Sequence, residues 1–376
     1  MRWHKANERY LMNRSPIATV GVVWSQRNTD FHGRDRADEL VDLPQRGFTQ
    51  ALIRARIPYL PVHVDDIDRA DGLSVLILPN VAAMSDEQCA AVRRFVNRGG
   101  GLIATGASSL ENEWGDPRPD FALADLFKTH AGKTFASDCR RWAGQSAHTY
   151  LRLTPEMRAR VYGPKAGNEP LPTGERHPIL YGFDETDILP YGGMLAELQV
   201  DSGAVVPMTF IPAFPVYPPE TAWMRQPKTG IAGAILNARP NGARIAYLPA
   251  DIDRRYARDH LPDHGNLLAN IVLWTAKNDI PLKVEGPGLI DCHVYQQPGR
   301  VILHLVNLTS AGTWRAPMDE LISVGPFQVS VRIPDTIQGR ALKLLVSQGT
   351  ARMDRSQSWA TFEVKSILDH EVAVIE

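Results

Sequence analysis

The chain has 376 residues, of which 44% are hydrophobic and 22% charged, and its 41 Lys and Arg residues nearly balance its 42 Asp and Glu residues. This balance gives no reason to expect nucleic acid or an anionic membrane as a partner. No apolar run approaches the roughly 20 residues of a transmembrane helix, and residues 1–14 carry charge without the apolar segment of a secretory leader. We therefore expect a cytoplasmic protein with two or three domains.

The first part of the chain alternates apolar runs with a helical pattern. Residues 1–16 are expected to be a connecting segment. Residues 17–25 and 73–79 are continuous apolar runs, which are typical of strands buried on both faces of a parallel sheet. Between them, apolar residues recur at helical spacing over 40–53.

A second helix and a further strand extend this pattern. Ser85 and Gln88 have the spacing of a capping box, for a helix that ends before Gly99. Residues 102–105 form the next buried strand. The resulting βαβαβ order predicts an α/β domain over residues 17–280, built on a doubly wound, mostly parallel sheet.

The pattern changes twice in the rest of the chain. Residues 115–230 are rich in proline and glycine and predict extended insertions. A hairpin over 231–249 and a helix over 261–276 follow. Proline and glycine residues near 280–288 interrupt the chain. Residues 289–376 then show only short segments in which apolar and polar residues alternate, which predict a small all-β sandwich.

The turn after residues 102–105 is where α/β hydrolases and amidotransferases carry a nucleophile, within Gly-x-Ser-x-Gly or Gly-x-Cys-x-Gly. Here the turn reads Thr-Gly-Ala-Ser-Ser over 105–109. Leu110 stands two residues after Ser108, where the sharp turn needs a small residue. We therefore expect no nucleophile elbow, and we assign no catalytic residue.

Three other kinds of catalytic or metal site can be checked against the sequence: a catalytic triad, a pair of carboxylates and a metal site. A nucleophile triad could combine Ser108 or Ser109 with Asp251 or Asp253 and His264. Its chain order matches that of α/β-hydrolases, but any long chain contains such an order by chance. Paired carboxylates in a loop do not establish the separation that a glycosidase needs. The histidines and the three cysteines have no metal-ligand spacing, so we expect no metal and no cofactor.

Polar residues follow the predicted strands at the carboxyl edge of the sheet, where open parallel sheets bind ligands. They could line a pocket for a sugar or a small carbonyl compound, or they could cap helices and hydrogen-bond loops. The second interpretation is favoured, because no catalytic motif accompanies them. The candidate residues are Ser25, Gln26, Arg27, Asn80, Thr105, Ser108, Asp251, Asp253, Arg254 and His264.

A set of segments along nearly the whole chain carries a family resemblance. The segments are VGVVWSQR at 20–27, DFHG at 30–33, LPN at 78–80, GGGLIATG at 99–106, NEWG at 112–115, RPDF at 118–121, YPPE at 217–220, YLPADID at 247–253, PDHGNLL at 262–268 and HLVNL at 304–308. With them the chain resembles the β-galactosidase trimerisation-type domain and the β-sandwich that follows it in glycoside hydrolases related to β-galactosidases. The resemblance implies a class I glutamine amidotransferase-like fold.

In that family a catalytic (β/α)₈ barrel precedes this region. A barrel needs at least roughly 200 residues, and about sixteen precede the first strand here. The resemblance therefore implies the accessory, non-catalytic half of a glycosidase, either encoded separately or cut short. Such a half would mediate assembly and complete a carbohydrate site. A stand-alone hydrolase that uses the edge pocket and a carbohydrate-binding protein are the alternatives.

The resemblance also implies partners. We expect a homo-oligomer, most simply a trimer, or association with a separately encoded barrel. Aromatic residues in or beside loops are candidates for interface anchors or for sugar stacking. The two loops expected to carry contacts are residues 26–36 and residues 212–223. The aromatic candidates are Trp24, Trp114, Trp142, Phe214, Tyr217 and Trp223.

Overall fold

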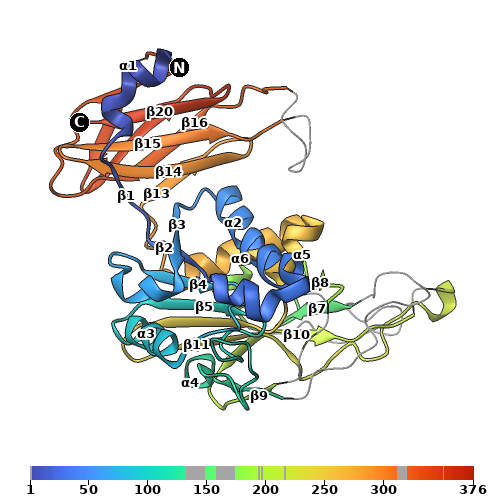
Figure 1. The fold of residues 1–376 in the computed structure, drawn as a ribbon. Coiled ribbons are helices and arrows are strands. Elements are labelled where there is room, and N and C mark those ends of the chain that lie inside the picture. Colours follow the sequence, from blue (N-terminus) through green and yellow to red (C-terminus); the bar gives the residue numbers. More distant parts are fainter. Residues whose placement is uncertain are drawn as a thin grey trace. The chain divides into compact units, whose positions relative to one another are not determined.

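The computed structural model describes residues 2–132, 149–157, 174–193, 195, 198–215, 217–310, 320–349 and 351–376. Contacts between residues divide the chain into two units (Figure 1). Unit 1 comprises Met1–Val20, Ala51–Leu60 and Asp279–Glu376, and unit 2 comprises Gly21–Gln50 and Pro61–Asn278. Neither unit is continuous in sequence.

In the described part of the chain, nine strands form the main sheet of unit 2, in the order β3-β2-β4-β5-β12-β11-β10-β7-β8. Their bounds are β2 Val20–Trp24, β3 Tyr59–His63, β4 Val75–Leu78, β5 Gly101–Thr105, β7 Tyr150–Leu153, β8 Ile188–Pro190, β10 Val205–Ile211, β11 Ala232–Ala238 and β12 Arg244–Leu248. Strands β4 and β12 run parallel to β5. Helices pack on this sheet, so the unit has an α/β structure.

The second half of the sheet corrects the prediction of a mostly parallel sheet. Strands β11, β10, β7 and β8 are joined antiparallel to one another, and β11 is antiparallel to β12. The physical reason lies in the connections. A tight hairpin can join only antiparallel strands, whereas a parallel pair needs a long crossover. The predicted hairpin over 231–249 is such a connection, and the insertion that precedes it supplies the outer strands.

Helices cover both faces of the sheet. Figure 1 shows α3 and α4 on one side and α5 and α6 on the other. The predicted capping box is present, because Ser85 and Gln88 each bond the other's backbone N–H. The helices are α2 Leu43–Arg54, α3 Asp86–Asn97, α4 Ala124–Phe127, α5 Ile252–Asp259 and α6 Pro262–Thr275, and shorter turns are η1 Asn28–Gly33, η2 Arg34–Arg36, η3 Asp38–Asp42, η4 Val64–Arg69, η5 Pro178–Leu180 and η6 Pro219–Thr221. Strands β6 Thr129–His130 and β9 Gln199–Val200 form a separate pair.

Alternating apolar side chains make the core under α3 and α4. Leu76, Leu102 and Tyr247 from β4, β5 and β12 are 0–1% exposed and share one cluster with Phe95 and Phe127 from the two helices. Each fully buried large apolar side chain contributes about 1.5–3 kcal/mol to folding. This packing holds the carboxyl ends of β4, β5 and β12 in fixed register.

Unit 1 contains two antiparallel sheets that share one apolar core. The first, ordered β1-β14-β15-β20-β17, comprises β1 Ser15–Pro16, β14 Ile290–Gln297, β15 Arg300–Asn307, β17 Leu342–Leu344 and β20 His370–Ile375. The second, ordered β13-β16-β19-β18, comprises β13 Leu282–Glu285, β16 Phe327–Arg332, β18 Met353–Ser356 and β19 Trp359–Val364. Their alternating inward side chains meet in the shared core.

Two segments distant in sequence complete unit 1. Residues 1–16, expected to connect domains, form helix α1 Arg2–Leu11 and strand β1, and β1 pairs with β14. Tyr10 is 2% exposed and packs on β15 and β20. Arg56 joins the segment Ala51–Leu60 to the same unit, because its guanidinium donates to the carbonyls of Val284 and Gly286 at 2.9 and 2.7 Å.

Candidate functional site at the carboxyl edge of the sheet

The polar residues that follow β2, β4 and β5 hydrogen-bond one another and nearby backbone. We call Asn28, Asn80, Thr105, Ser108 and Asp253 the edge network. Asn28 Oδ1 accepts the backbone N–H groups of Ala82 and Ala83, at 2.9 and 3.1 Å. Its Nδ2 donates to the carbonyl of Asn80 at 3.1 Å. Thus one side chain after β2 satisfies three backbone groups of the loop after β4.

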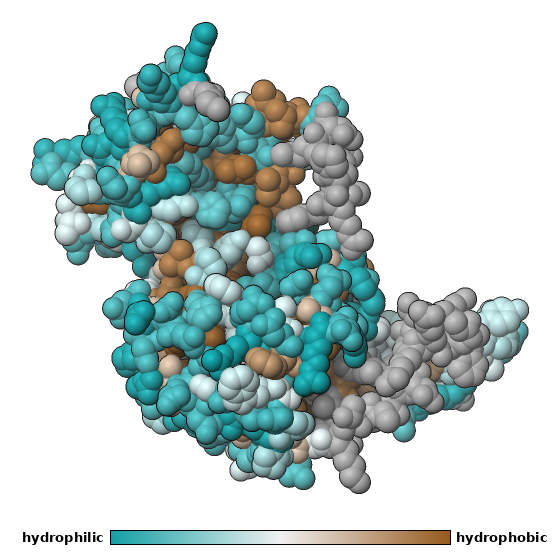
Figure 2. All heavy atoms as spheres, viewed as in Figure 1, coloured by the Kyte–Doolittle hydropathy of each residue, from teal (hydrophilic) through white to brown (hydrophobic). Residues whose placement is uncertain are grey.

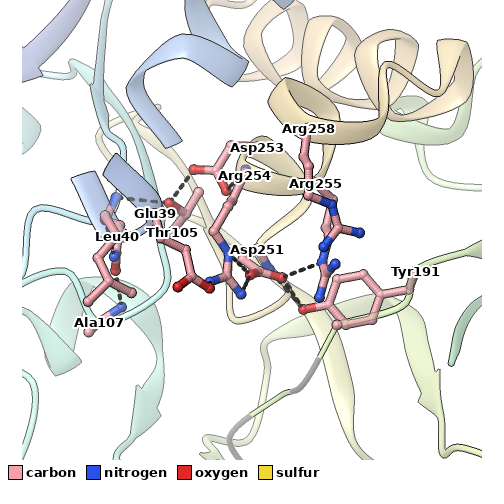
Figure 3. Close-up of polar contacts among 12 residues, drawn as sticks. Glu39, Leu40, Thr105, Ala107, Tyr191, Asp251, Asp253, Arg254, Arg255 and Arg258 are labelled. Atoms are coloured by element: carbon pink, nitrogen blue, oxygen red, sulfur yellow. Dashed lines mark hydrogen bonds and ion pairs between the residues drawn. The ribbon is translucent and has the colours of Figure 1, made fainter. Parts of the chain in front are cut away.

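Thr105 links the ends of β4, β5 and the start of α5. Its hydroxyl donates to Asp253 Oδ2 at 2.6 Å and accepts the N–H of Asn80 at 2.9 Å (Figure 3). Asp253 also accepts the N–H of Arg254 at 2.8 Å. Burial raises the pKa of the Asp253 carboxyl to about 6, although these hydrogen bonds oppose the shift. Asp253 is therefore a buried acid with both of its oxygens occupied.

The two serines of the turn contact backbone. Ser108 Oγ lies 2.7 Å from the carbonyl of Thr105 and 3.1 Å from that of Leu78, and it accepts the N–H of Val81 at 3.1 Å. Ser109 Oγ accepts the N–H of Leu123 at 3.1 Å. Both residues are fully buried. Both hydroxyls therefore hydrogen-bond the backbone of this turn or of adjacent segments.

His264 stands apart from these serines. Its Nε2 donates to the carbonyl of Pro190 at 2.7 Å, which leaves Nδ1 unprotonated in the neutral ring. Burial lowers the pKa of this imidazole, so the ring is neutral near pH 7. The contacts of Ser108, Asp253 and His264 therefore do not assemble the triad considered from the sequence.

A second group lies where β12 leads into α5. We call Asp251, Arg254, Arg255, Tyr191 and Glu39 the arginine cluster (Figure 3). Arg254 forms an ion pair with Asp251 and a second one, at 2.7 Å, with Glu39. The Tyr191 hydroxyl donates to Asp251 Oδ1 at 2.5 Å, and Arg255 Nε lies 3.9 Å from the same oxygen. Burial raises the pKa of Tyr191 well above its ordinary range, so it is a donor at neutral pH.

The predicted residues after β2 lie at the surface or support it. Ser25 Oγ accepts the N–H of Asn28 at 3.3 Å, and Gln26 donates to Asp30 at 2.9 Å. The Arg27 guanidinium stands 5.1 Å from the ring centre of Trp114, whose side chain is 55% exposed. The contacts of Ser25 and Gln26 stabilise the turn after β2, and that of Arg27 positions the exposed ring of Trp114.

Sequence reasoning missed several members of both groups. Asn28 could have been found as an amide in the turn that follows β2, a usual position for an Asn that hydrogen-bonds loop backbone. Glu39 and Tyr191 come from η3 and from the segment after β8, and nothing in the sequence marks Glu39 as a partner of Arg254 or Tyr191 as a partner of Asp251. Tertiary structure alone brings them together.

The described cysteines lie in the interior of the protein. Cys89 and Cys292 are buried and unpaired, and burial raises the pKa of the Cys89 thiol to about 11, so both are packed apolar groups. Cys139 and Trp142 lie outside the described residues. Among the described residues, no group of three or more His, Cys, Asp or Glu side chains is placed to hold a metal ion. No helix in the same residues is long and apolar enough to cross a membrane.

No family model and no curated protein matches this sequence. Solved structures do match. α-L-Fucosidase isoenzyme 2 from Paenibacillus thiaminolyticus superposes with a TM-score of 0.72 at 15% identity, over 99% of this chain and 50% of its own. The β-galactosidase from Bacillus circulans sp. alkalophilus has a TM-score of 0.59 at 12% identity, over 100% of this chain and 44% of its own length. The β-galactosidase from Rahnella sp. R3 has a TM-score of 0.59 at 11% identity, over 97% of this chain and 42% of its own length. At these identities the likeness is one of fold. The chain spans half or less of the length of these three glycosidases.

Proposed function

We propose that this chain is the accessory portion of a glycoside hydrolase related to β-galactosidases, and that it serves assembly and not bond cleavage. In this proposal unit 2 is a glutamine amidotransferase-like α/β domain of the trimerisation type, and unit 1 is its accompanying β-sandwich. The main support is the superposition, since 97–100% of this chain, and so residues of both units, matches 42–50% of three glycosidases.

The carboxyl edge of the sheet supports the non-catalytic part of the proposal. A catalytic group must reach the reacting atoms of a substrate. Ser108, Ser109 and Thr105 instead bond backbone or the buried Asp253. Asp251 is held by Arg254 and Tyr191. Most of the polar groups that the sequence places at this edge therefore have internal partners.

Exposed aromatic side chains support an assembly role. The surface seen in Figure 2 is mostly hydrophilic. Against that background Trp114 is 55% exposed, Trp223 49% and Tyr217 72%. Phe31 packs edge-on against Trp114 at 5.5 Å, and the Arg225 guanidinium stands 3.6 Å from the ring centre of Trp223, so both indoles are held in place. Held aromatic groups of this kind often anchor interfaces.

The proposal is tested first by activity. Purified chain is assayed with aryl galactosides and aryl fucosides, and no turnover above the blank is expected. Turnover that disappears in Asp251→Asn or Asp253→Asn would overturn the proposal in favour of a stand-alone hydrolase. Binding of free sugars without turnover would favour the carbohydrate-binding alternative.

The assembly role is tested by light scattering at micromolar concentration. We expect a homo-oligomer, most simply a trimer, or a stable complex with a separately produced catalytic barrel. Trp114→Ala or Trp223→Ala should weaken that association by about 30-fold, the effect of losing an interface anchor. Trp114 packs on Arg27 and Phe31 of the loop 26–36, and Trp223 ends the loop 212–223. Leu368→Ala is the control, since Leu368 is 52% exposed but is not aromatic and belongs to unit 1. A monomer that also fails to bind a barrel would contradict the proposal.

A further inference from the structure

A cleft lies within unit 1, between helix α1 and the turn that follows β17. Its volume is about 640 Å³, which falls in the range of roughly 300–1,000 Å³ that is usual for ligand pockets. The helix contributes Arg2, Trp3 and Asn7 to its lining, and the opposite wall contributes Lys343 and Gln348. All of these residues belong to unit 1, so one unit forms the cleft by itself.

The helix wall is attached near both of its ends. Figure 1 shows α1 beside β20 of the sandwich. Near the end of the helix, Tyr10 is 2% exposed and packs against Val372. Near its start, Trp3 Nε1 donates to the carbonyl of Leu345 at 3.3 Å, and Asn7 Nδ2 donates to the carbonyl of Trp3 at 3.0 Å. The indole therefore joins the helix to the opposite wall of the cleft.

The opposite wall is fixed by a buried carboxylate. Glu371 is 2% exposed, and its oxygens accept the N–H groups of Val346 at 2.9 Å, Ser347 at 3.0 Å and Val372 at 2.8 Å. The N–H of Leu345 bonds the carbonyl of Val372 at 2.9 Å. Both walls are thus formed before a ligand arrives, so little conformational entropy is lost when one binds.

The lining combines apolar groups with amides. The indole of Trp3 and the side chain of Leu344 give the cleft an apolar part. Within the described residues, Asn7 Oδ1 and the carboxamide of Gln348 have no hydrogen-bond partner, so both can bond a ligand. A sugar ring has apolar C–H faces and hydroxyl groups at its edge, and this lining offers a match to each.

The charge of the lining narrows the class of sugar. Two of the described lining residues are cations and none is an acid. Lys343 Nζ lies 3.0 Å from Glu376 Oε2, whereas Arg2 has no ion pair with any described residue. The cleft therefore attracts an anion. We propose that it binds a short saccharide that carries carboxylates, a uronic acid oligosaccharide, with Arg2 facing a carboxylate and Trp3 beside a sugar ring. This binding site goes beyond the proposed accessory role.

Two disaccharides that differ only at C6 test the proposal on the full chain: β-1,4-linked diglucuronic acid and cellobiose. The readout is the NMR shift of the Trp3 indole N–H, assigned with Trp3→Phe. We expect a dissociation constant on the order of 1 mM for the diuronate and binding at least about fivefold weaker for cellobiose, the effect of one exposed ion pair. Equal affinity for the two sugars, or binding of neither, would overturn the proposal.

A matched pair of cations on one helix tests the role of Arg2. Arg2→Gln should weaken diuronate binding about fivefold and leave cellobiose binding unchanged. Lys5→Gln is the control, since Lys5 is exposed on the same helix and does not line the cleft. Equal losses in the two variants would show a general attraction to a basic helix and would contradict the site.

A variant that fills the cleft tests its location without a change of charge. Ala6 is exposed on α1 and lines the cleft, so Ala6→Phe should abolish binding of both sugars. Lys5→Phe carries the same ring outside the cleft and should still bind. Diuronate binding that persists in Ala6→Phe would place the saccharide elsewhere and overturn the proposal. None of these outcomes alters the expected results for turnover or assembly, so failure here is distinct from failure of the accessory function.

Discussion

Tyr191 and Asp251 hydrogen-bond to each other twice. The phenol donates to the Asp251 carboxylate at 2.5 Å and accepts the Asp251 backbone N–H at 3.1 Å. Tyr191 follows β8 and Asp251 follows β12, so this pair fastens the antiparallel part of the sheet to the end of its parallel part. The contact explains why a residue of the insertion is only 3% exposed.

Tyr191→Phe should destabilise the protein by about 1–3 kcal/mol, because the partly buried carboxylate and the N–H of Asp251 lose a partner. Glu39→Gln is the control. Glu39 contacts Arg254 from a side chain that is 48% exposed, and exposed ion pairs contribute about 0–1 kcal/mol. Urea denaturation of the two variants measures the difference. Equal effects would mean that the Tyr191 contact contributes no more than a surface pair.

Asp253→Asn should change how stability depends on pH. Burial raises the Asp253 pKa to about 6, against 3.8 for the ordinary group, so the folded protein holds this proton more tightly than the unfolded chain does. The contribution of Asp253 to stability is therefore greatest below pH 4 and falls by about 3 kcal/mol as the pH rises to 6. Relative to the natural protein, the variant should gain stability across that window. Denaturation between pH 4 and 7 measures this.

The control for that experiment is Asp263→Asn, an exposed acid in the first turn of α6. A pH-dependent difference of the same size in both variants would mean that burial of Asp253 is not its source. No change with pH in the difference between Asp253→Asn and the natural protein would contradict the raised pKa of Asp253.

Gly47→Ala should be strongly destabilising although alanine favours helices. A Cβ on Gly47, within α2, would lie 2.5 Å from the backbone carbon of Asp253 and closer to its oxygen. Backbone cannot give way as a side chain can, so we expect a loss of about 1–3 kcal/mol or more, well above the helix gain of roughly 0.5–1 kcal/mol. Gly230→Ala, at a site with no atom within 4 Å, should be near neutral. Thermal denaturation of both variants tests the close approach.

His304 should make unit 1 sensitive to acid. Arg14 donates to His304 Nε2 at 2.7 Å, so the ring is neutral, and burial, together with Arg14, His293 and His370, lowers its pKa from 6.5 to about 4. The unfolded chain therefore takes up this proton first as the pH falls. Stability from this group is complete above pH 6.5 and declines by about 3 kcal/mol by pH 4.

His304→Gln should remove that decline, and His4→Gln, at an exposed position on α1, should leave it unchanged. The measurement is the urea midpoint at pH 7 and pH 4.5 for the three proteins. A decline of the same size in His304→Gln would assign the acid sensitivity to other groups.

The sequence predicted what depends on local pattern. The Ser85 capping box and the buried runs of β4 and β5 follow from residue type and period, and both are present. The antiparallel extension of the sheet was not predicted, because the pattern of a short strand within a proline-rich insertion does not indicate which strand it pairs with. Contacts among the candidate site residues likewise depend on tertiary structure. Thr105 and Asp253 meet because β5 is the neighbour of β12, and β12 leads into α5. His264 instead contacts Pro190 from α6.

The discontinuity of unit 1 has a consequence for synthesis on the ribosome. Helix α1 and strand β1 leave the ribosome before unit 2, but their partners on β14, β15 and β20 lie in a segment that is made after unit 2. At roughly 5–20 residues per second, the first helix waits on the order of tens of seconds for the surface that buries Tyr10. Unit 2 can complete its sheet during that wait. A nascent chain halted once Asn278 has emerged from the ribosomal exit tunnel should therefore hold a folded unit 2 and an N-terminal segment open to protease. Synthesis of the rest of unit 1 should then protect that segment.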